Sequence, residues 1–420
     1  MLEQQPIVTS DAHAELARIE KCMLPIKGEA AAYSFGESQA RSAGLDDDGA
    51  RGKTPAETVK TIYGKSYAVV IGIDNYQHQK KLKGAVREIL ATEMLEALGV
   101  YTSKTFSVVE TGEALTRGDE PSPTRSAVMT RLSHGHIRIG TFQRLLALEE
   151  RAHMAQLVDY CLAQFPGPPP PEDAPGREDP AVRLMHLVVE RLADLAASWM
   201  VAGFVHGVLN TDNMNISGES FDYGPWRFLP RWDPGFTAAY FDHQGLYAFG
   251  RQPEALHWNC GQLAVALRLL ADAPPLIAAM ERFGPLYMEA IGRRWCWRLG
   301  VASRGPEADG RLVAACEKAL SDSATAPDAF FFAHRGGRGA EGSLAEAFAG
   351  YEPVAGAHPY WNGGGPQSML IEEVETIWAA IAENDDWQPL ADKVAALREM
   401  GAAHGPPPQP AGHRRAESAT

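Results

Sequence analysis

The chain has 420 residues, of which 45% are hydrophobic and 22% are charged, and these proportions exclude a wholly disordered protein. Its 39 Lys and Arg against 53 Asp and Glu give a net charge of −14, which argues against a nucleic-acid coat. It contains no apolar run of about 18 residues, no secretory signal at its N-terminus and no CxxC pair among five cysteines. We therefore expect a cytoplasmic protein that binds neither nucleic acid nor membrane.

The predicted elements alternate between strand and helix at first and are mostly helical later. Short β-branched runs predict strands, and apolar residues at helical spacing predict helices. In chain order they are strand 67–73, helix 85–98, strands 105–110 and 126–132, helix 181–203, and helical segments near 258–272, 275–291, 309–320 and 368–400. This order predicts an α/β protein in which a small α+β lobe precedes a larger, mainly helical lobe.

Composition also predicts where the chain divides. Residues 1–58 are expected to be poorly ordered, and residues 166–180 (PGPPPPEDAPGREDP) to form an exposed loop, because proline excludes both helix and central strand. The rest divides into an N-terminal lobe (59–150), a C-terminal lobe with the polar motif described below (151–265), a helical extension (266–400) and a disordered tail (401–420).

The densest polar cluster follows the long predicted helix and reads HGVLNTDN from His206 to Asn213, then DYG from Asp222. Residues 214–221 between them are expected to form a hairpin with its turn at Ser217-Gly218. An amide oxygen and a carboxylate at one mouth are suitable ligands for Mg²⁺ and nucleotide phosphates. The alternative is that both side chains only serve turns.

The cluster has the spacing of the protein-kinase motifs H-R-D-x-x-x-x-N and D-F-G. The position of the kinase aspartate holds Val208, which cannot accept a proton, and the nearest carboxylate is Asp212. The sequence therefore predicts a kinase-like metal site and weakens ordinary phosphoryl transfer to a hydroxyl.

The run HGVLNTDNMNISGESFDYGPWRFLPRWDPGF, followed by DHQG from Asp242 and QPEALHWN from Gln252, resembles the selenoprotein O family of protein adenylyltransferases. The resemblance implies a bilobal, protein-kinase-like fold that binds ATP in a flipped orientation. It also implies Mg²⁺ (with Mn²⁺ as an alternative) and transfer of AMP to Ser, Thr or Tyr hydroxyls of proteins.

The resemblance assigns roles to individual residues. Asp212 takes the place of the proton acceptor, and Asn213 and Asp222 those of the metal ligands. Arg131 and Arg138 in RLSHGHIRIGTFQ take those of the phosphate-binding arginines, a role that suits the guanidinium fork.

The resemblance also places a helical glutamate at Glu88, where the family pairs it with a nucleotide-binding lysine. Lys83 in LKGA matches the motif of that lysine but precedes Glu88 by only five residues. Lys65 has a more natural separation and no motif around it.

The first 80 residues depart from the family. Its Gly-rich loop is missing, since DDGARG at 47–52 imitates it poorly, and KSYAVVIGIDNYQHQKKLKGAV resembles the first strand of caspase-like peptidases. No cysteine has the context that a peptidase nucleophile requires, so we interpret this segment either as a chance resemblance or as a foreign piece. No cysteine follows Cys316, so redox control through the family's C-terminal residue is not expected.

Three functions stay open from the sequence. The first is adenylyl transfer from ATP to proteins, with weaker MgATP binding than in an intact family member because one wall of the nucleotide site is missing. The second is a kinase that transfers the γ-phosphoryl group. The third is a non-catalytic remnant that serves as a binding module.

Overall fold

The computed structural model describes residues 80–115, 124–354 and 358–408, all of which belong to one unit of the chain. The predicted strand 67–73, Lys65, the 47–52 segment and the predicted poorly ordered region 1–58 lie outside the described residues. Within the described part the structure is mixed α/β and mainly helical.

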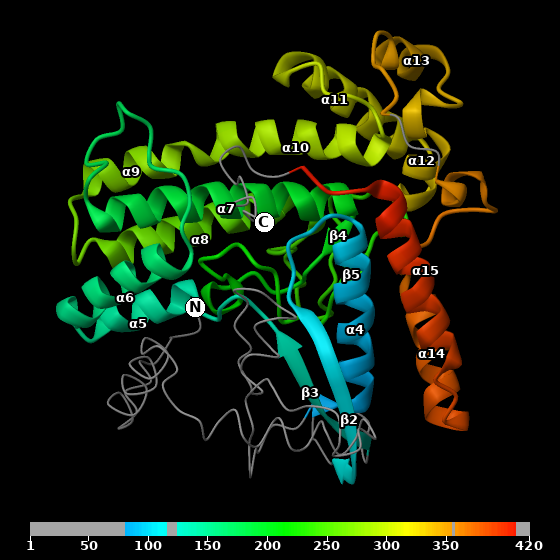
Figure 1. The fold of residues 1–420 in the computed structure, drawn as a ribbon, viewed down its shortest axis with the longest axis horizontal. Helices are drawn as coiled ribbons and strands as arrows, with labels where there is room; N and C mark the ends of the chain where they lie inside the picture. The colour runs from blue at the N-terminus through cyan, green and yellow to red at the C-terminus, as the bar shows by residue number, and fades with distance from the viewer. Residues whose placement is uncertain (1–79, 116–123, 355–357, 409–420) are drawn as a thin grey trace, which may run out of the picture. The chain divides into compact units, whose positions relative to one another are not determined.

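The first described elements are a small antiparallel sheet and the helix that covers one of its faces (Figure 1). They are β1 (Lys80–Lys81), α4 (Leu82–Ala97), β2 (Lys104–Leu115) and β3 (Thr124–Leu132), with strand order β1-β3-β2. Val108 pairs with Met129 on the face that packs against α4, whereas Val109 and Val128 are exposed on the other face. This alternation confirms the predicted strands 105–110 and 126–132, and α4 confirms the predicted helix 85–98.

The central helix of the structure is α7 (Pro180–Ala202), which confirms the predicted helix 181–203. Asp179 caps its N-terminus by accepting a hydrogen bond from the Ala181 N–H (2.8 Å), and Pro180 occupies the first turn. Gly203 ends it at φ 66°, a left-handed conformation that favours glycine. Nearly all of α7 is buried, and residues 165–179 before it contain no helix or strand, as predicted for the proline-rich loop.

Other helices surround α7 or extend beyond it. α5 (Ile139–Ala147) and α6 (Arg151–Gln164) precede α7, and α6, α8, α9 and α10 pack against it (Figure 1). The later helices are α8 (Gln252–Leu267), α9 (Ala273–Glu281), α10 (Phe283–Leu299), α11 (Pro306–Asp322), α12 (Pro327–Ala333), α13 (Gly342–Phe348), α14 (Ile371–Asn384) and α15 (Gln388–His404). No helix in the described ranges is both long and apolar enough to cross a membrane.

Two predictions about the C-terminal region need correction. The helical segment predicted at 368–400 is two helices, because Asp385 adopts a left-handed conformation that ends α14. The predicted disordered tail from 401 is wrong for its first residues, since α15 continues to His404. An added Cβ on Gly401 would lie 3.1 Å from the Ala97 Cα. The small residues that suggested a disordered tail therefore allow α15 to approach α4 closely.

α4 lies between the β2–β3 hairpin on one side and α14 and α15 on the other (Figure 1). Lys83 of α4 forms an ion pair with Glu375 of α14 (2.6 Å), and Glu93 forms one with Arg398 of α15 (2.6 Å). The C-terminal helices therefore help to fix α4 on the sheet.

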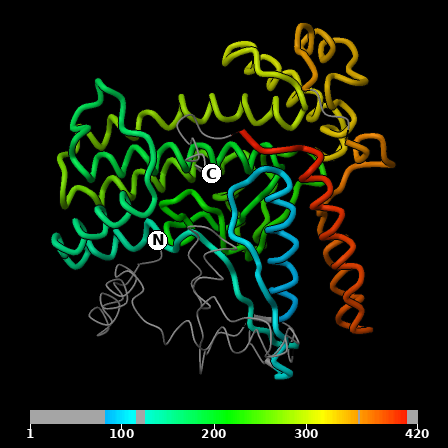
Figure 2. The backbone as a smooth tube through the Cα atoms, viewed as in Figure 1, coloured from blue at the N-terminus to red at the C-terminus, as the bar shows by residue number. Residues whose placement is uncertain are grey.

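Between α7 and α8 the chain has little regular structure and follows the irregular green path in Figure 2. Its only strands within this stretch are β4 (Phe204–Val205) and β5 (Arg227–Phe228), which pair antiparallel. The polar cluster found in the sequence lies on the loops between β4 and β5.

Candidate functional site

His206 connects the two halves of the polar cluster. Its backbone N–H donates to the side chain of Gln252 (3.0 Å), and its ring Nε2 donates to the carbonyl of Phe221 (3.0 Å), the residue before Asp222. Burial lowers the pKa of His206, so the ring is neutral and Nε2 carries its proton at neutral pH. His206 therefore holds the loop of Asp212 and the segment of Asp222 together.

The loop from His206 ends in a single 3₁₀ turn, η1 (Thr211–Asn213). The side chain of Asn210 caps this turn by accepting from the Asp212 N–H (3.1 Å), and the Thr211 hydroxyl bonds Gln143 of α5 (2.6 Å). Asn213 donates its side-chain amide to the Val208 carbonyl (3.0 Å), which leaves its side-chain oxygen available as a ligand. Among the described residues the Asp212 carboxylate is exposed and makes no hydrogen bond or ion pair.

Asp222 follows in a left-handed conformation with φ 63°, which is uncommon for a residue other than glycine. Its neighbours are fixed on both sides, because Phe221 accepts from His206 and the Tyr223 hydroxyl bonds Thr102 (2.5 Å). The Asp222 side chain is exposed and has no hydrogen bond or ion pair within the described ranges. A strained backbone that carries an uncommitted carboxylate is typical of a functional position.

The predicted hairpin over 214–221 is wrong in its pairing. A turn does form, with the Gly218 N–H bonded to the Asn215 carbonyl (3.0 Å), but its two arms do not pair with each other. Met214 and Ile216 instead pair with residues 137–139, and Ser220 pairs with residues 101–103. The reason is that the segments at both ends of the β2–β3 hairpin offer free backbone groups to these arms.

Arg138 and Arg131 lie at the start of α5 and in β3 respectively. The Arg138 guanidinium donates to the backbone carbonyl of Asp212 (3.4 Å), which brings the second motif arginine to the Asp212 loop. Arg131 forms an ion pair with Glu88 of α4, whose side chain is buried. The structure thus brings Arg131 to Glu88 and Arg138 to Asp212.

Lys83 is not brought to Glu88. A separation of five residues places two helical side chains about 140° apart around the axis. The Lys83 amine reaches α14, where it pairs with Glu375, while Glu88 reaches Arg131 of the sheet.

The site contains residues that the sequence interpretation did not select. His136 stands in the arginine motif, with its ring 4.5 Å from that of Phe221 in an edge-to-face contact. Partial burial, followed by the charges of Arg138 and Arg131, lowers the pKa of His136 to about 4. The sequence feature that could have identified His136 is its position between the two arginines of RLSHGHIR.

Arg87, which precedes Glu88, was also not selected as a site residue. Its guanidinium lies 4.7 Å from the centre of the Trp226 ring and donates to the Trp226 carbonyl (3.2 Å). No sequence pattern predicted that contact. It fixes the segment after Gly224 to α4.

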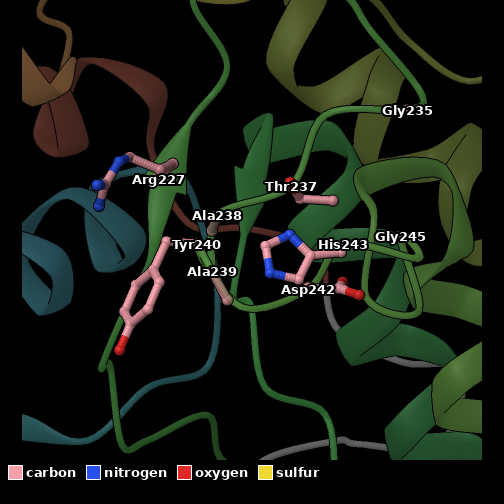
Figure 3. A pocket seen from close by; sticks show the side chains of 9 residues that line it. All are labelled: Arg227, Gly235, Thr237, Ala238, Ala239, Tyr240, Asp242, His243 and Gly245. Atoms are coloured by element: carbon pink, nitrogen blue, oxygen red, sulfur yellow. The ribbon is translucent and has the colours of Figure 1, made fainter.

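A pocket of about 480 Å³ lies beside this site. It is lined by Arg227 of β5 and by residues of the 235–245 loop, with Arg227 and Tyr240 on one side and His243 on the other (Figure 3). An added Cβ on Gly207 would lie 3.1 Å from the Ala238 Cβ and 3.4 Å from the Ala239 N. The wall of the pocket therefore contacts the same loop that carries Asp212.

Comparison with known sequences gives one consistent result. Residues 78–341 match the family described as "Protein adenylyltransferase SelO". A protein named "Protein nucleotidyltransferase YdiU" from Gloeobacter violaceus is 39% identical over 351 residues, covering 76% of this chain and 70% of the relative. Relatives of the same name are 39% identical in Synechocystis (76% and 72% covered) and 35% identical in Trichodesmium erythraeum (88% and 81% covered).

The sequence motif and the similar proteins together define a protein of the nucleotidyltransferase class. The chain belongs to the SelO family of protein adenylyltransferases. The resemblance seen in the run from His206 is thereby confirmed. The interpretation of the caspase-like segment, residues 65–86, as a foreign piece does not hold from residue 78 onward, where the family match begins.

Proposed function

We propose that this chain transfers AMP from ATP to a Ser, Thr or Tyr hydroxyl of another protein and releases pyrophosphate. The observation that carries this proposal is that two unpaired carboxylates lie in the same site as an arginine of the sequence motif. Asp212 and Asp222 present free carboxylates among the described residues, and Arg138 reaches the Asp212 loop. The sheet with α4 and the helical part around α7 correspond in this proposal to the two lobes of a kinase-like fold.

The donor set fits a divalent cation shared with a nucleotide. Within the described residues no three His, Cys, Asp or Glu side chains cluster in a way that holds a metal by themselves. The Asn213 oxygen and the Asp222 carboxylate are hard ligands, and phosphate oxygens and water complete such a shell for Mg²⁺ or Mn²⁺. When bound, the cation neutralises charge that builds up on the phosphates.

Residues of the protein accept the proton of the hydroxyl and bind the phosphates. Asp212 accepts the proton of the acceptor hydroxyl, for which its exposed and unpaired carboxylate is suited. Arg131 and Arg138 bind phosphate oxygens, with Arg131 oriented by its ion pair to buried Glu88. Lys83 stays a predicted phosphate ligand, and its ion pair with Glu375 must break before it can act.

The identity of the transferred group tests the proposal. The purified protein is incubated with ATP labelled at the α or the γ position, with Mg²⁺ or Mn²⁺. We expect protein-bound label from the α position only. Transfer from the γ position alone would identify a kinase, and no transfer together with no nucleotide binding would identify a binding module.

Conservative variants test the site. Asp222→Asn keeps the side-chain shape and the tolerance for positive φ but removes the charge, so we expect loss of transfer by about 100-fold or more. Asp212→Asn removes the proton acceptor and lowers the rate without weakening ATP binding. Asp159→Asn on the exposed side of α6 is the matched control and keeps full activity. Normal transfer by Asp222→Asn would refute the assignment.

A further inference from the structure

The loop that lines the pocket is a built structure. Backbone hydrogen bonds close its base, from the Phe249 N–H to the Phe236 carbonyl and from the Gly250 N–H to the Pro234 carbonyl (both 2.9 Å). At its tip the Asp242 carboxylate accepts from the Leu246 and Tyr247 N–H groups (both 2.8 Å). A compact loop closed in this way is an Ω-loop, a class that often carries function.

The loop presents aromatic side chains to solvent. Tyr240 is 85% exposed and Phe241 52%, and their rings pack edge to face at 5.3 Å. Exposed aromatic side chains on a fixed loop are typical anchors for a protein partner. Their position next to the Asp212 loop makes them accessible to the substrate whose hydroxyl must reach Asp212.

The pocket also borders on the positive charge of two neighbouring arginines, Arg227 and Arg87. Arg227 donates to the carbonyls of Pro225 (3.1 Å) and Trp226 (2.9 Å), and Arg87 donates to the same Trp226 carbonyl. Neither guanidinium forms an ion pair within the described residues. Two of the carboxylates that act on these arginines have other partners: Glu375 of α14 is paired with Lys83, and Glu88 of α4 is paired with Arg131. Asp242, which also lines the pocket, accepts from the backbone N–H groups of its own loop.

Burial and the neighbouring Arg227 lower the pKa of Arg87 to about 10. Two close cations that share one carbonyl are stabilised when a carboxylate joins them. Arg227 is the one of the two that lines the pocket.

We propose that this pocket receives the segment of the protein substrate that carries the acceptor hydroxyl, and that Arg227 selects an Asp or Glu side chain in that segment. The inference rests on the proposed function, because it names the substrate class of the same site. Tyr240 and Phe241 supply apolar contact, and Arg227 supplies the preference for acidic sequence.

Binding of short peptides tests the pocket separately from chemistry. Fluorescein-labelled peptides carry a central Ser, Thr or Tyr, and Glu or Gln at one flanking position at a time. Their affinity for the wild-type protein is measured by anisotropy with Mg²⁺ and an ATP analogue that cannot be cleaved between the α and β phosphates. We expect Glu to bind at least about fivefold tighter than Gln at one or two positions.

Variants of the pocket then assign the preference. Arg227→Gln removes the preference for Glu, whereas Arg227→Lys, which keeps the charge, retains part of it. Tyr240→Ala weakens the Glu and Gln peptides alike. Arg231→Gln is the matched control, since the Arg231 side chain is 70% exposed and is not among the pocket residues. Thermal unfolding of each variant shows that the fold is kept.

Two results overturn the proposal. One is equal binding of Glu and Gln peptides at every position in the wild type. The other is a preference that survives unchanged in a folded Arg227→Gln protein. Failure of α-label transfer would instead refute the proposed function, while a Glu preference that depends on Arg227 would leave the docking pocket in place.

Discussion

At the scale of single residues, Glu88 and Lys83 of the same helix have different partners, Arg131 and Glu375. In the kinase pattern a helical glutamate orients a lysine of the sheet, whereas here Glu88 forms an ion pair with Arg131 of β3. An arginine keeps its charge when buried and binds phosphate through two donors at once. In the proposed function, Glu88 therefore orients an arginine toward the phosphates in place of a lysine.

Glu88→Gln is expected to weaken ATP binding without removing the capacity for transfer. The change leaves the side-chain volume in place but removes the charge that holds Arg131, so the phosphates lose an oriented cation. Loss of such a charged contact corresponds to about tenfold in affinity. Calorimetric titration with an uncleavable ATP analogue and Mg²⁺ measures the effect.

The control for this variant is Glu307→Gln in α11. Glu307 is exposed and pairs with Arg311 of the same helix, so its loss leaves nucleotide affinity unchanged. Equal affinity in both variants and the wild type would show that Glu88 does not position Arg131.

At the scale of elements, local sequence was a good guide wherever one periodicity persisted over several turns. The helix at 181–203 and the strands at 105–110 and 126–132 were predicted because the residue types in the sequence match the element, with apolar residues at helical spacing in the first case. The Asp212 and Asp222 loops were located by motif, but their partners were not. Pairing of Met214 with Ile139, and of Ser220 with Tyr101, depends on contacts distant in sequence that no local pattern encodes.

Gly207 limits how the Asp212 loop can change. It has φ 88°, and an added Cβ would lie 2.9 Å from Pro225 and 3.1 Å from Ala238. Gly207→Ala therefore adds both conformational strain and a steric clash between the Asp212 loop and the pocket wall. We expect a loss of about 1–3 kcal/mol in unfolding free energy, with reduced label transfer.

Gly284→Ala in α10 is the matched control, because no atom lies within 4 Å of its added Cβ and its φ is not positive. Alanine favours helix over glycine, so this variant is neutral or stabilised by up to about 1 kcal/mol. Urea unfolding of both proteins separates the two cases. A fully stable and active Gly207→Ala protein would contradict the close packing described here.

At the scale of the whole molecule, buried histidines predict sensitivity to acid. His186 of α7 is buried and accepts a hydrogen bond from Arg282 at its Nδ1 (2.8 Å). Burial and the Arg282 charge lower the pKa of His186 from 6.5 to about 4, and burial lowers that of His206 as well. Both groups are neutral in the folded protein at neutral pH.

The sign of the effect follows from proton binding. In the unfolded chain His186 binds a proton below about pH 6.5, whereas in the folded protein it does so only near pH 4. The stability of the folded state therefore falls as the pH drops through this window. For His186 the loss between pH 7 and pH 5 is about 2 kcal/mol. His186→Gln is expected to reduce the loss by about that amount in urea unfolding measured at the two pH values. An unchanged pH dependence would show that His186 protonates without cost.

The C-terminal helices link overall stability to the site, because α15 and α14 press α4 and its Glu88 onto the sheet. Gly401 of α15 approaches Ala97 so closely that an added Cβ would lie 3.1 Å from the Ala97 Cα. Gly401→Val must therefore push α15 away from α4.

We expect Gly401→Val to lose about 1–3 kcal/mol of stability and to bind the ATP analogue more weakly, although Gly401 contacts no site residue. Gly310→Val in α11 is the control, since it places the same β-branched residue in a helix with no atom within 4 Å of its Cβ. Urea unfolding and calorimetric titration measure the two quantities on the same samples. If Gly401→Val lost stability but bound the analogue as tightly as Gly310→Val, α15 would support the fold without influencing the nucleotide site.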